Sequence, residues 1–448
     1  MSKSAGVKAN RFGSLLATLL LGSALTGQEL SLDEAVRLAL QHNVDIANTA
    51  LDVSKTKDRS KAFRSTLLPR LSFYALGSEQ LKPVSITIPA GTLGMIGNVQ
   101  IPMQDVHYTT PMQPTGFLFG RIQQPLSGIY RTRLNLKALD FSIQLAQQKS
   151  RSKRQDVVRN VKQLYYNIEQ VQSSLLAMQE TVRLYKEVER LTGDYVAKQA
   201  ALESELLQAQ SSLANVEQSE LVLSNQEAKA KEQLNDLLGR DVLTEFDVTS
   251  IDDGASHPEI DLVAARKKAL AERPEIQQAQ LKVLQSEQEE RAKHAEYIPD
   301  LSAEFNTLTL LNFNRFLPGG TYSVGLSLSW EPFDWGRKKN ELAEKRDTVA
   351  QDKNTQSSAE RKVVMNVDDD YRQIQQSWSK LRAAKLSQRA ATENLRVDNN
   401  LYKVQAALLK VVFQAQTTLA QANSDYQRAL ADYWTAQAEF EHALGEDQ

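Results

Sequence analysis

The placement of proline constrains this chain more than any other feature of its sequence. All 12 prolines lie in two windows, 69–125 and 258–332, and none lies between the windows or after the second. Because proline breaks the interior of a helix, the two proline-free tracts can form very long helices. Both tracts are rich in Ala, Leu, Gln, Glu, Lys and Arg, which favour helix. The pattern therefore predicts two long helical regions separated by segments of another kind.

Apolar residues in these tracts repeat with the spacing of a coiled coil. Over 157–185 and again over 408–440, they step by four and three residues without interruption. This heptad repeat predicts helices that pack side by side along their length. A helix over about 131–190 is roughly 90 Å long, which is too long for one compact globule. We therefore expect a rod or a tube of long helices.

Two parts of the chain repeat each other's sequence. Residues 32–72 align with 262–302 at an offset of 230, and 157–241 align without gaps with 363–447 at an offset of 206. A correspondence of this length indicates two copies of one unit, a tandem duplication. Because the offset falls from 230 to 206, the first proline window carries about 24 extra residues.

Each copy is expected to contain a helical start, two strands and a pair of long helices, so the predicted fold class is mainly α with a small β part. The predicted division of the chain is a first repeat over 28–241, with strands at about 70–80 and 115–126 and a helix pair over 131–238; a linker over 242–260; and a second repeat over 261–448, with strands at about 300–311 and 321–332 and a helix pair over 337–444.

The first 27 residues have the pattern of a secretory signal peptide. Lys3, Lys8 and Arg11 precede an apolar run of about ten residues, and small residues follow it. The run is too short to span a membrane of about 30 Å as a helix. Nowhere later does the chain approach about 18 consecutive apolar residues, so no transmembrane helix is expected. The sequence thus predicts an exported protein.

Short segments inside the proline windows alternate apolar and polar residues. The clearest is 322–330, where five apolar residues alternate with serines and Gly325. Alternation that ends in aromatic residues is typical of membrane β-barrels, although a soluble sheet with one wet face has a similar pattern. In a barrel, the residues predicted to face lipid are Tyr322, Val324, Leu326, Leu328 and Trp330.

Four strands are too few to close a membrane barrel, because the smallest known ones have about eight. An open sheet edge in lipid would leave backbone groups without hydrogen bonds. Either the sheet is soluble, or several chains share one barrel. Pro125, Pro332 and Gly336 are expected to let the chain leave a strand and start a helix. The extra residues of the first window form either an extended outer hairpin or an ordered plug.

Composition argues against several other functions. The chain carries 53 Lys and Arg against 55 Asp and Glu, a formal net charge of -2, which does not favour a nucleic-acid binder. It has no Cys, and its five His are too far apart in sequence for a zinc motif. The acidic run 368–370 suggests metal binding at first sight. Consecutive carboxylates on a helix point about 100° apart, so we interpret this run as a solvated face and expect neither an enzyme nor a cofactor.

Taken together, these features resemble the TolC family of outer-membrane efflux proteins. The phrases that carry the resemblance are LDEAVRLAL at 32–40, LPRLSF at 68–73, AERPEI at 271–276, IPDLS at 298–302 and EPFDWGR at 331–337. The resemblance implies a homotrimer with a shared 12-strand barrel in the lipid of the outer membrane, continuous with an α-helical coiled-coil tube in the periplasm. It further implies a channel that takes small molecules or proteins from an inner-membrane pump and a periplasmic adaptor (membrane fusion) protein.

The resemblance also assigns residues to the tips of the helix pairs. In the family, a Gly at each tip contacts the adaptor, and Asp residues six and nine positions later narrow the closed pore in one copy. The corresponding positions here are Gln199 and Gln405 for the adaptor contact, and Glu205, Gln208, Val411 and Gln414 for the constriction. Only Glu205 keeps a charge. Three copies of it would form an acidic ring that attracts cations; the alternative is a solvated coiled-coil charge.

One other function stays open at this point. A soluble periplasmic coiled-coil adaptor or scaffold without a pore would have the same long helices. It would not need the apolar, aromatic-ended face of 322–330.

Overall fold

The computed structural model of the chain describes residues 28–79, 81–83, 85–109, 112–250, 259–312, 319–404, 406 and 409–446. The predicted signal peptide and Gln405 lie outside these described residues.

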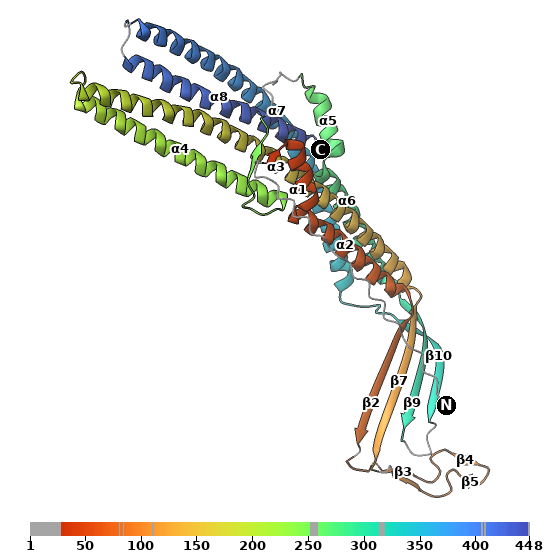
Figure 1. The fold of residues 1–448 in the computed structure, drawn as a ribbon. Coiled ribbons are helices and arrows are strands. Elements are labelled where there is room, and N and C mark those ends of the chain that lie inside the picture. The colour runs from red at the N-terminus through yellow and green to blue at the C-terminus, as the bar shows by residue number, and fades with distance from the viewer. Residues whose placement is uncertain are drawn as a thin grey trace, which may run out of the picture.

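Two pairs of long helices dominate the molecule (Figure 1). The first pair is α3 (Gly128–Ala197) with α4 (Glu203–Leu238), and the second is α7 (Arg337–Lys403) with α8 (Leu409–Ala443). At 70 residues, α3 is roughly 105 Å long. None of the helices in the described ranges is both long and apolar enough to cross a membrane.

Shorter helices cover the middle of the long ones. They are α1 (Leu32–His42), α2 (Val44–Arg64), α5 (Leu262–Glu272) and α6 (Pro274–His294), and the single turns Ser65–Leu67 and Ala295–Tyr297 follow α2 and α6. Side-chain caps start several of them. Asn43 accepts hydrogen bonds from the backbone N–H groups of Asp45 and Ile46, and Asp261 does the same for Val263 and Ala264.

A glycine ends α4 and another follows α8, and each packs against the break between two short helices. Gly239 has φ +67°, and a Cβ there would collide with the carbonyl group of His42. Gly445 has φ +80°, and a Cβ there would lie 3.1 Å from the backbone nitrogen of Arg273. Both positions need glycine, because L side chains rarely adopt this backbone conformation.

Two buried clusters form the core where short and long helices meet. The first gathers side chains of α1, α3 and α4, including Val161, Tyr165 and Leu234. The second gathers side chains of α5, α7 and α8, including Val367 and Tyr433. Trp434 packs against both clusters, so it joins the two halves of the chain. Most heptad residues over 412–440 are buried, whereas in α3 about half of those over 157–185 are only half-buried.

Two short strands that the sequence analysis missed tie the first cluster together. β1 (Gln28–Leu30) pairs in parallel with β8 (Phe246–Val248). The buried hydroxyl of Tyr165 donates to the carbonyl oxygens of Leu30 and Thr249, at 2.9 and 3.0 Å. The segments 28–30 and 246–249, which precede α1 and follow α4, are therefore bound to α3.

At the other end of the molecule lies an antiparallel sheet of four strands (Figure 1). Its order is β10–β9–β7–β2, with β2 at Arg70–Glu79, β7 at Pro114–Pro125, β9 at Asp300–Leu311 and β10 at Gly320–Ser329. The extra residues of the first window form two small ladders beyond it: β3 (Ser85–Ile88) with β6 (Val106–Thr109), and β4 (Met95–Ile96) with β5 (Val99–Gln100). The fold is mainly α with a small antiparallel β part, as predicted.

Candidate transmembrane conduit

One face of the four-stranded sheet is apolar and open. Tyr322, Val324, Leu326, Leu328 and Trp330, predicted to face lipid, are 62–84% exposed. The strand register places further apolar residues of the other strands on the same face; these include Leu301, Phe305, Ile122, Leu71 and Phe73. An apolar surface of this extent is normally covered in a folded protein. The arrangement suits contact with lipid, which stays a prediction for each of these residues.

The opposite face is polar near the long helices. One row across the strands holds Ser72, Arg121, Asn306 and Ser323. The Arg121 side chain donates to the Asn306 side-chain oxygen at 3.0 Å and lies 3.7 Å from the Glu304 carboxylate. This face can be hydrated, as the inner wall of a water-filled barrel must be.

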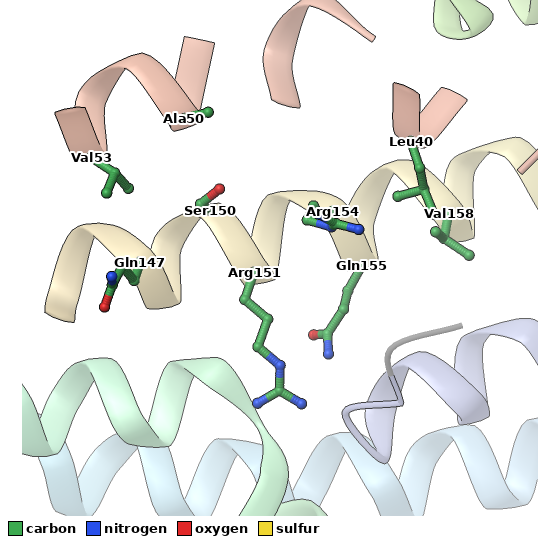
Figure 2. Close-up of a pocket in the computed structure, with 9 residues that line it drawn as sticks. All are labelled: Leu40, Ala50, Val53, Gln147, Ser150, Arg151, Arg154, Gln155 and Val158. Atoms are coloured by element: carbon green, nitrogen blue, oxygen red, sulfur yellow. The ribbon is translucent and has the colours of Figure 1, made fainter. Parts of the chain in front are cut away.

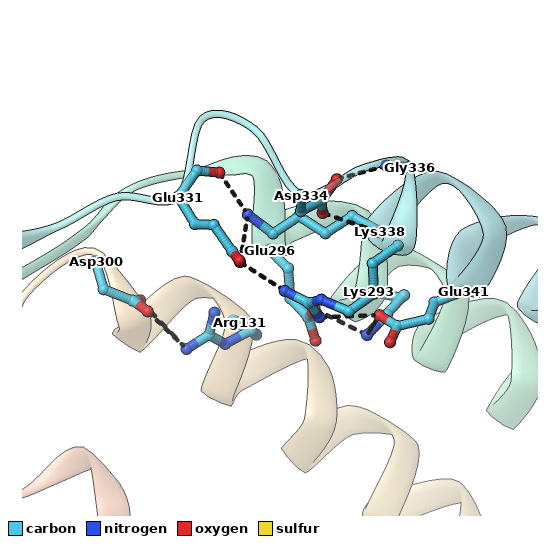
Figure 3. Close-up of polar contacts among 10 residues, drawn as sticks. Arg131, Lys293, Glu296, Asp300, Glu331, Asp334, Gly336, Lys338 and Glu341 are labelled. Carbon is cyan, nitrogen blue, oxygen red and sulfur yellow. Dashed lines mark hydrogen bonds and ion pairs between the residues drawn. The ribbon is translucent and has the colours of Figure 1, made fainter.

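The chain turns sharply between β10 and α7. Trp335 and Gly336 both have positive φ, 52° and 84°. The Asp334 carboxylate then accepts hydrogen bonds from the backbone N–H groups of Gly336 and Lys338, at 3.1 and 3.0 Å (Figure 3). The bond from Lys338 contributes most to lowering the pKa of Asp334. Asp334 thus acts as the cap that starts α7, and the predicted bend involves Gly336 directly.

The chain also bends between β7 and α3. Pro125 is the last residue of β7, and α3 begins three residues later at Gly128. The Ser127 hydroxyl donates to the carbonyl oxygen of Pro299 at 2.7 Å and accepts from the N–H of Leu301 at 2.8 Å. The bend between β7 and α3 is therefore bound to the start of β9.

Ion pairs connect the helices next to the sheet to one another (Figure 3). Lys293 of α6 lies 2.6 Å from the Glu341 carboxylate of α7 and 2.8 Å from that of Glu296. Burial lowers the pKa of Lys293, but hydrogen bonds to both carboxylates outweigh it, and the net direction is upward. Arg131 of α3 pairs with Asp300 of β9 at 3.2 Å. These ion pairs thus connect α6 with α7, and α3 with β9, where the strands meet the helices.

Two exposed aromatic side chains lie against each other at this junction. Phe333 and Trp335 have ring centroids 4.9 Å apart and are 68% and 86% exposed, and Trp330 is close to them in sequence. Aromatic residues of this kind occupy the boundary between membrane and water. Of these aromatic residues, only Trp330 belongs to the alternating run 322–330; Phe333 and Trp335 lie in the phrase EPFDWGR and were not predicted as site residues.

The tip of the first long hairpin turns at Gln199. This residue has φ +56°, the left-handed conformation that favours glycine. The N–H of Gln199 donates to the carbonyl of Val196 at 2.9 Å, and the N–H of Ala200 donates to that of Tyr195 at 2.8 Å. At the position where the resemblance places Gly, this chain thus has a non-glycine residue in a backbone conformation that favours glycine.

Glu205 lies in the first turn of α4, just after this tip. Its carboxylate accepts a hydrogen bond of 3.4 Å from the backbone N–H of Leu202, the residue that precedes the helix. Leu202 has no side-chain oxygen to cap the helix, so Glu205 contributes a cap and favourable charge at the helix N-terminus. Gln208 follows it and is exposed as well.

The second tip holds the other two constriction positions. Val411 and Gln414 of α8 line a groove of about 340 Å³ together with Ala391, Asn394 and Asp398 of α7. Glu205 and Val411 therefore lie on the tips of different hairpins in one chain (Figure 1). Whether any of these side chains narrows a pore stays a prediction.

Comparison with known proteins identifies the family. A model of the outer membrane efflux protein family matches residues 35–240 and 265–446. The chain belongs to the outer membrane efflux protein family. It is an outer-membrane protein, with its helical tube in the periplasm. The predicted family, fold class and location are confirmed.

Solved structures of outer-membrane channels share the fold of this efflux-family chain. The Campylobacter jejuni CmeC outer membrane channel is 14% identical with a TM-score of 0.76, and covers 99% of this chain and 94% of its own. Vibrio cholerae VceC is 14% identical with a TM-score of 0.72, at 92% and 96% coverage. The open state of Neisseria gonorrhoeae MtrE is 16% identical with a TM-score of 0.72, at 93% and 89% coverage. A search of curated protein sequences gives no match.

The acidic run of this efflux-family protein does not converge on one point. Asp368 forms a two-pronged ion pair with Arg266, at 2.7 and 2.8 Å, and Asp369 pairs with Arg372. Asp370 is half-buried, and burial and the nearby Glu439 raise its pKa to about 6. Within the described ranges, no group of three or more Asp, Glu or His residues is placed to hold a metal ion.

A groove of about 510 Å³ runs between α1, α2 and α3 (Figure 2). Leu40, Ala50 and Val53 form one of its walls. The groove is also lined by Arg151 and Gln155 of α3, which extend toward the second half of the chain. There Arg151 donates to the carbonyl oxygen of Glu272 and Gln155 donates to that of Gly445, both at 2.9 Å. These two side chains connect α3 to the end of α5 and to the residues after α8, and we assign the groove a packing role.

Proposed function

We propose that three copies of this chain form the exit duct of a tripartite efflux or type I secretion system. The single observation that carries the trimer is the four-stranded sheet. β2 and β10 are its two edges, and within the described part of the chain neither edge is paired. Pairing β10 of one copy with β2 of the next closes a barrel of 12 strands, because each copy supplies four.

The same proposal covers partners and chemistry. Small molecules or proteins would enter the tube from an inner-membrane pump through a periplasmic adaptor, which would dock on the tips at Gln199 and Gln405. The channel would carry out no covalent reaction. We also propose that residues 1–27 are removed on export, and that 28–241 and 261–448 are duplicated repeats joined by a linker over 242–260. A soluble scaffold without a pore is the weaker proposal, because it leaves the apolar face uncovered.

The mass of the protein in mild detergent tests the trimer. The protein is extracted from outer-membrane fractions without boiling, and the molar mass of the particle is measured by light scattering. A boiled sample is the matched control. We expect three chains per particle before boiling and one afterwards, and discrete ion conductance when the unboiled protein enters a planar bilayer. A monomer in the unboiled sample overturns the shared barrel. Mass spectrometry of the purified chain checks the removal of residues 1–27.

A further inference from the structure

The strands of the first repeat are joined by an ordered segment, 85–109, that carries almost no charge. Its two ladders pair Ser85 with Thr109 at one end and Ile96 with Val99 at the other. No Asp, Glu, Lys or Arg occurs in 85–104. The Asp105 carboxylate accepts a hydrogen bond of 2.8 Å from the N–H of Ala90, so it binds within the same segment.

Large apolar side chains project from this segment. Leu93, Met95, Ile96 and Met103 are 62–75% exposed. The backbone around them is held by hydrogen bonds between Leu93 and Ile101 and between Ile101 and Gly94, both 2.9 Å. An ordered surface that shows so many apolar side chains marks a contact site.

The sheet itself becomes apolar on its inner face toward this segment. Beyond the polar row that contains Arg121, the strands β2, β7 and β9 carry apolar side chains in the next two rows on the same face, whereas β10 places Thr321 in the first of these rows. The first row holds Tyr74, Phe119 and Leu308, and the second holds Leu76, Phe117 and Leu310. The inner wall of the proposed barrel therefore changes from polar to apolar as it approaches segment 85–109.

We propose that segment 85–109 of each copy packs against the same segment of the neighbouring copies, and that the three segments close the outer mouth of the channel. This proposal rests on the proposed trimer. In Figure 1 the segment leaves β2 and β7 and extends past the β10 side of the sheet, where the β2 of the next copy would pair. Residues 85–104 carry no charged side chain, and the Asp105 carboxylate is hydrogen-bonded to Ala90 within its own segment, so three copies can meet there without burying an unpaired charge.

The chemistry of the segment favours a second copy over a lipid surface. Anionic lipid headgroups attract Lys and Arg, and 85–104 contains neither. The two apolar rows of the inner wall continue the same surface into the channel. A narrow apolar mouth excludes water and ions by dewetting, so the resting channel would conduct ions poorly and would admit apolar or amphipathic solutes more readily.

Single cysteines test the contact between copies, because the chain has no cysteine of its own. We would introduce Ile96→Cys, and as a matched control Leu243→Cys, which replaces an apolar residue that is 75% exposed in the turn after α4. A short bismaleimide is added to the intact channel in cells. We expect linked chains for Ile96→Cys and unlinked chains for Leu243→Cys.

Conductance supplies an independent readout. A triple variant with Leu93, Ile96 and Met103 changed to Ser should raise the single-channel conductance several-fold, whereas Leu243→Ser should leave it unchanged. If the protein is a trimer, but Ile96→Cys chains stay unlinked and the triple variant conducts like the wild type, the proposed closure of the outer mouth is wrong. The proposed trimer is then unaffected. A monomeric mass before boiling overturns the proposed trimer and this contact together.

Discussion

The two halves of the chain share their middle and differ at their ends. In both halves a glycine next to a long helix packs against the break between two short helices, Gly239 near His42 and Gly445 near Arg273. The ends that would meet other molecules differ. Segment 85–109 lies between the strands of the first half, where the chain carries about 24 extra residues, and the tip positions carry Glu205 in one half and Val411 in the other. Packing constrains the middle, and the ends are free to take on separate roles.

The largest expected effect comes from the two glycines. Gly239→Ala should destabilise the channel by about 3 kcal/mol or more, because the new Cβ meets backbone atoms of His42 in addition to the strain of positive φ. Gly445→Ala should cost about 1–2 kcal/mol, because its nearest backbone neighbour lies at 3.1 Å and the strain of φ dominates.

The measurement is the free energy of unfolding in denaturant, followed by the helical circular dichroism signal of the folded channel. Gly77→Ala serves as a control, because nothing lies within 4 Å of its Cβ position. Equal losses for Gly239→Ala and Gly445→Ala would contradict the distinction between the two docking sites.

A pair of tyrosines at equivalent positions gives the next effect. The hydroxyl of Tyr165 is buried and donates to the carbonyl groups of Leu30 and Thr249, whereas the hydroxyl of Tyr371 accepts from Gln375 in an exposed setting. Tyr165→Phe should cost about 1–2 kcal/mol, and Tyr371→Phe about 0.5 kcal/mol or less. The same unfolding measurement compares them. A larger loss for Tyr371→Phe would show that β1 and β8 add little to the first half.

Sequence reasoning reached the parts of this fold that depend on periodicity. Heptads predicted the long helices, and alternation predicted that the apolar residues from Tyr322 to Trp330 share one face of the sheet, because these patterns repeat over many residues. It missed β1 and β8, since three-residue strands that pair across more than 200 positions leave no local period. It also missed the apolar inner rows around Phe117, because they require the register of three strands.

A smaller, pH-dependent effect separates the halves at Asp370, whose counterpart in the first half is Leu164. Burial and Glu439 raise the pKa of Asp370 to about 6 from its usual 3.8, so the folded state binds this proton more tightly than the unfolded state. Its contribution to stability therefore falls as the pH rises from about 4 to 6 and stays low above that range.

Asp370→Asn removes the destabilisation that the ionised Asp370 carboxylate causes at high pH. We expect it to stabilise the channel by about 1 kcal/mol at pH 8, allowing for partial solvent screening, and by progressively less as the pH falls from 6 to 4. The unfolding free energies of variant and wild type are measured at each pH. Asp369→Asn is the matched control, because that carboxylate is exposed and paired with Arg372. A gain for Asp370→Asn that does not vary with pH would rule out titration as its cause.

The smallest effect concerns the tips, where the halves differ by one charge. Glu205→Gln keeps an oxygen that can accept from the N–H of Leu202, so the cap of α4 should survive with a loss below about 0.5 kcal/mol. If three copies of Glu205 face the pore, the ratio of cation to anion permeability should fall in bilayer recordings, and Val411→Glu should raise it by adding a second ring. The control is Gln210→Glu, which adds a charge to α4 after Glu205 and Gln208. It tests whether any added charge on α4 changes the selectivity. Unchanged selectivity in Glu205→Gln would leave Glu205 as a helix cap, and the charge difference between the tips would then lie outside the ion path.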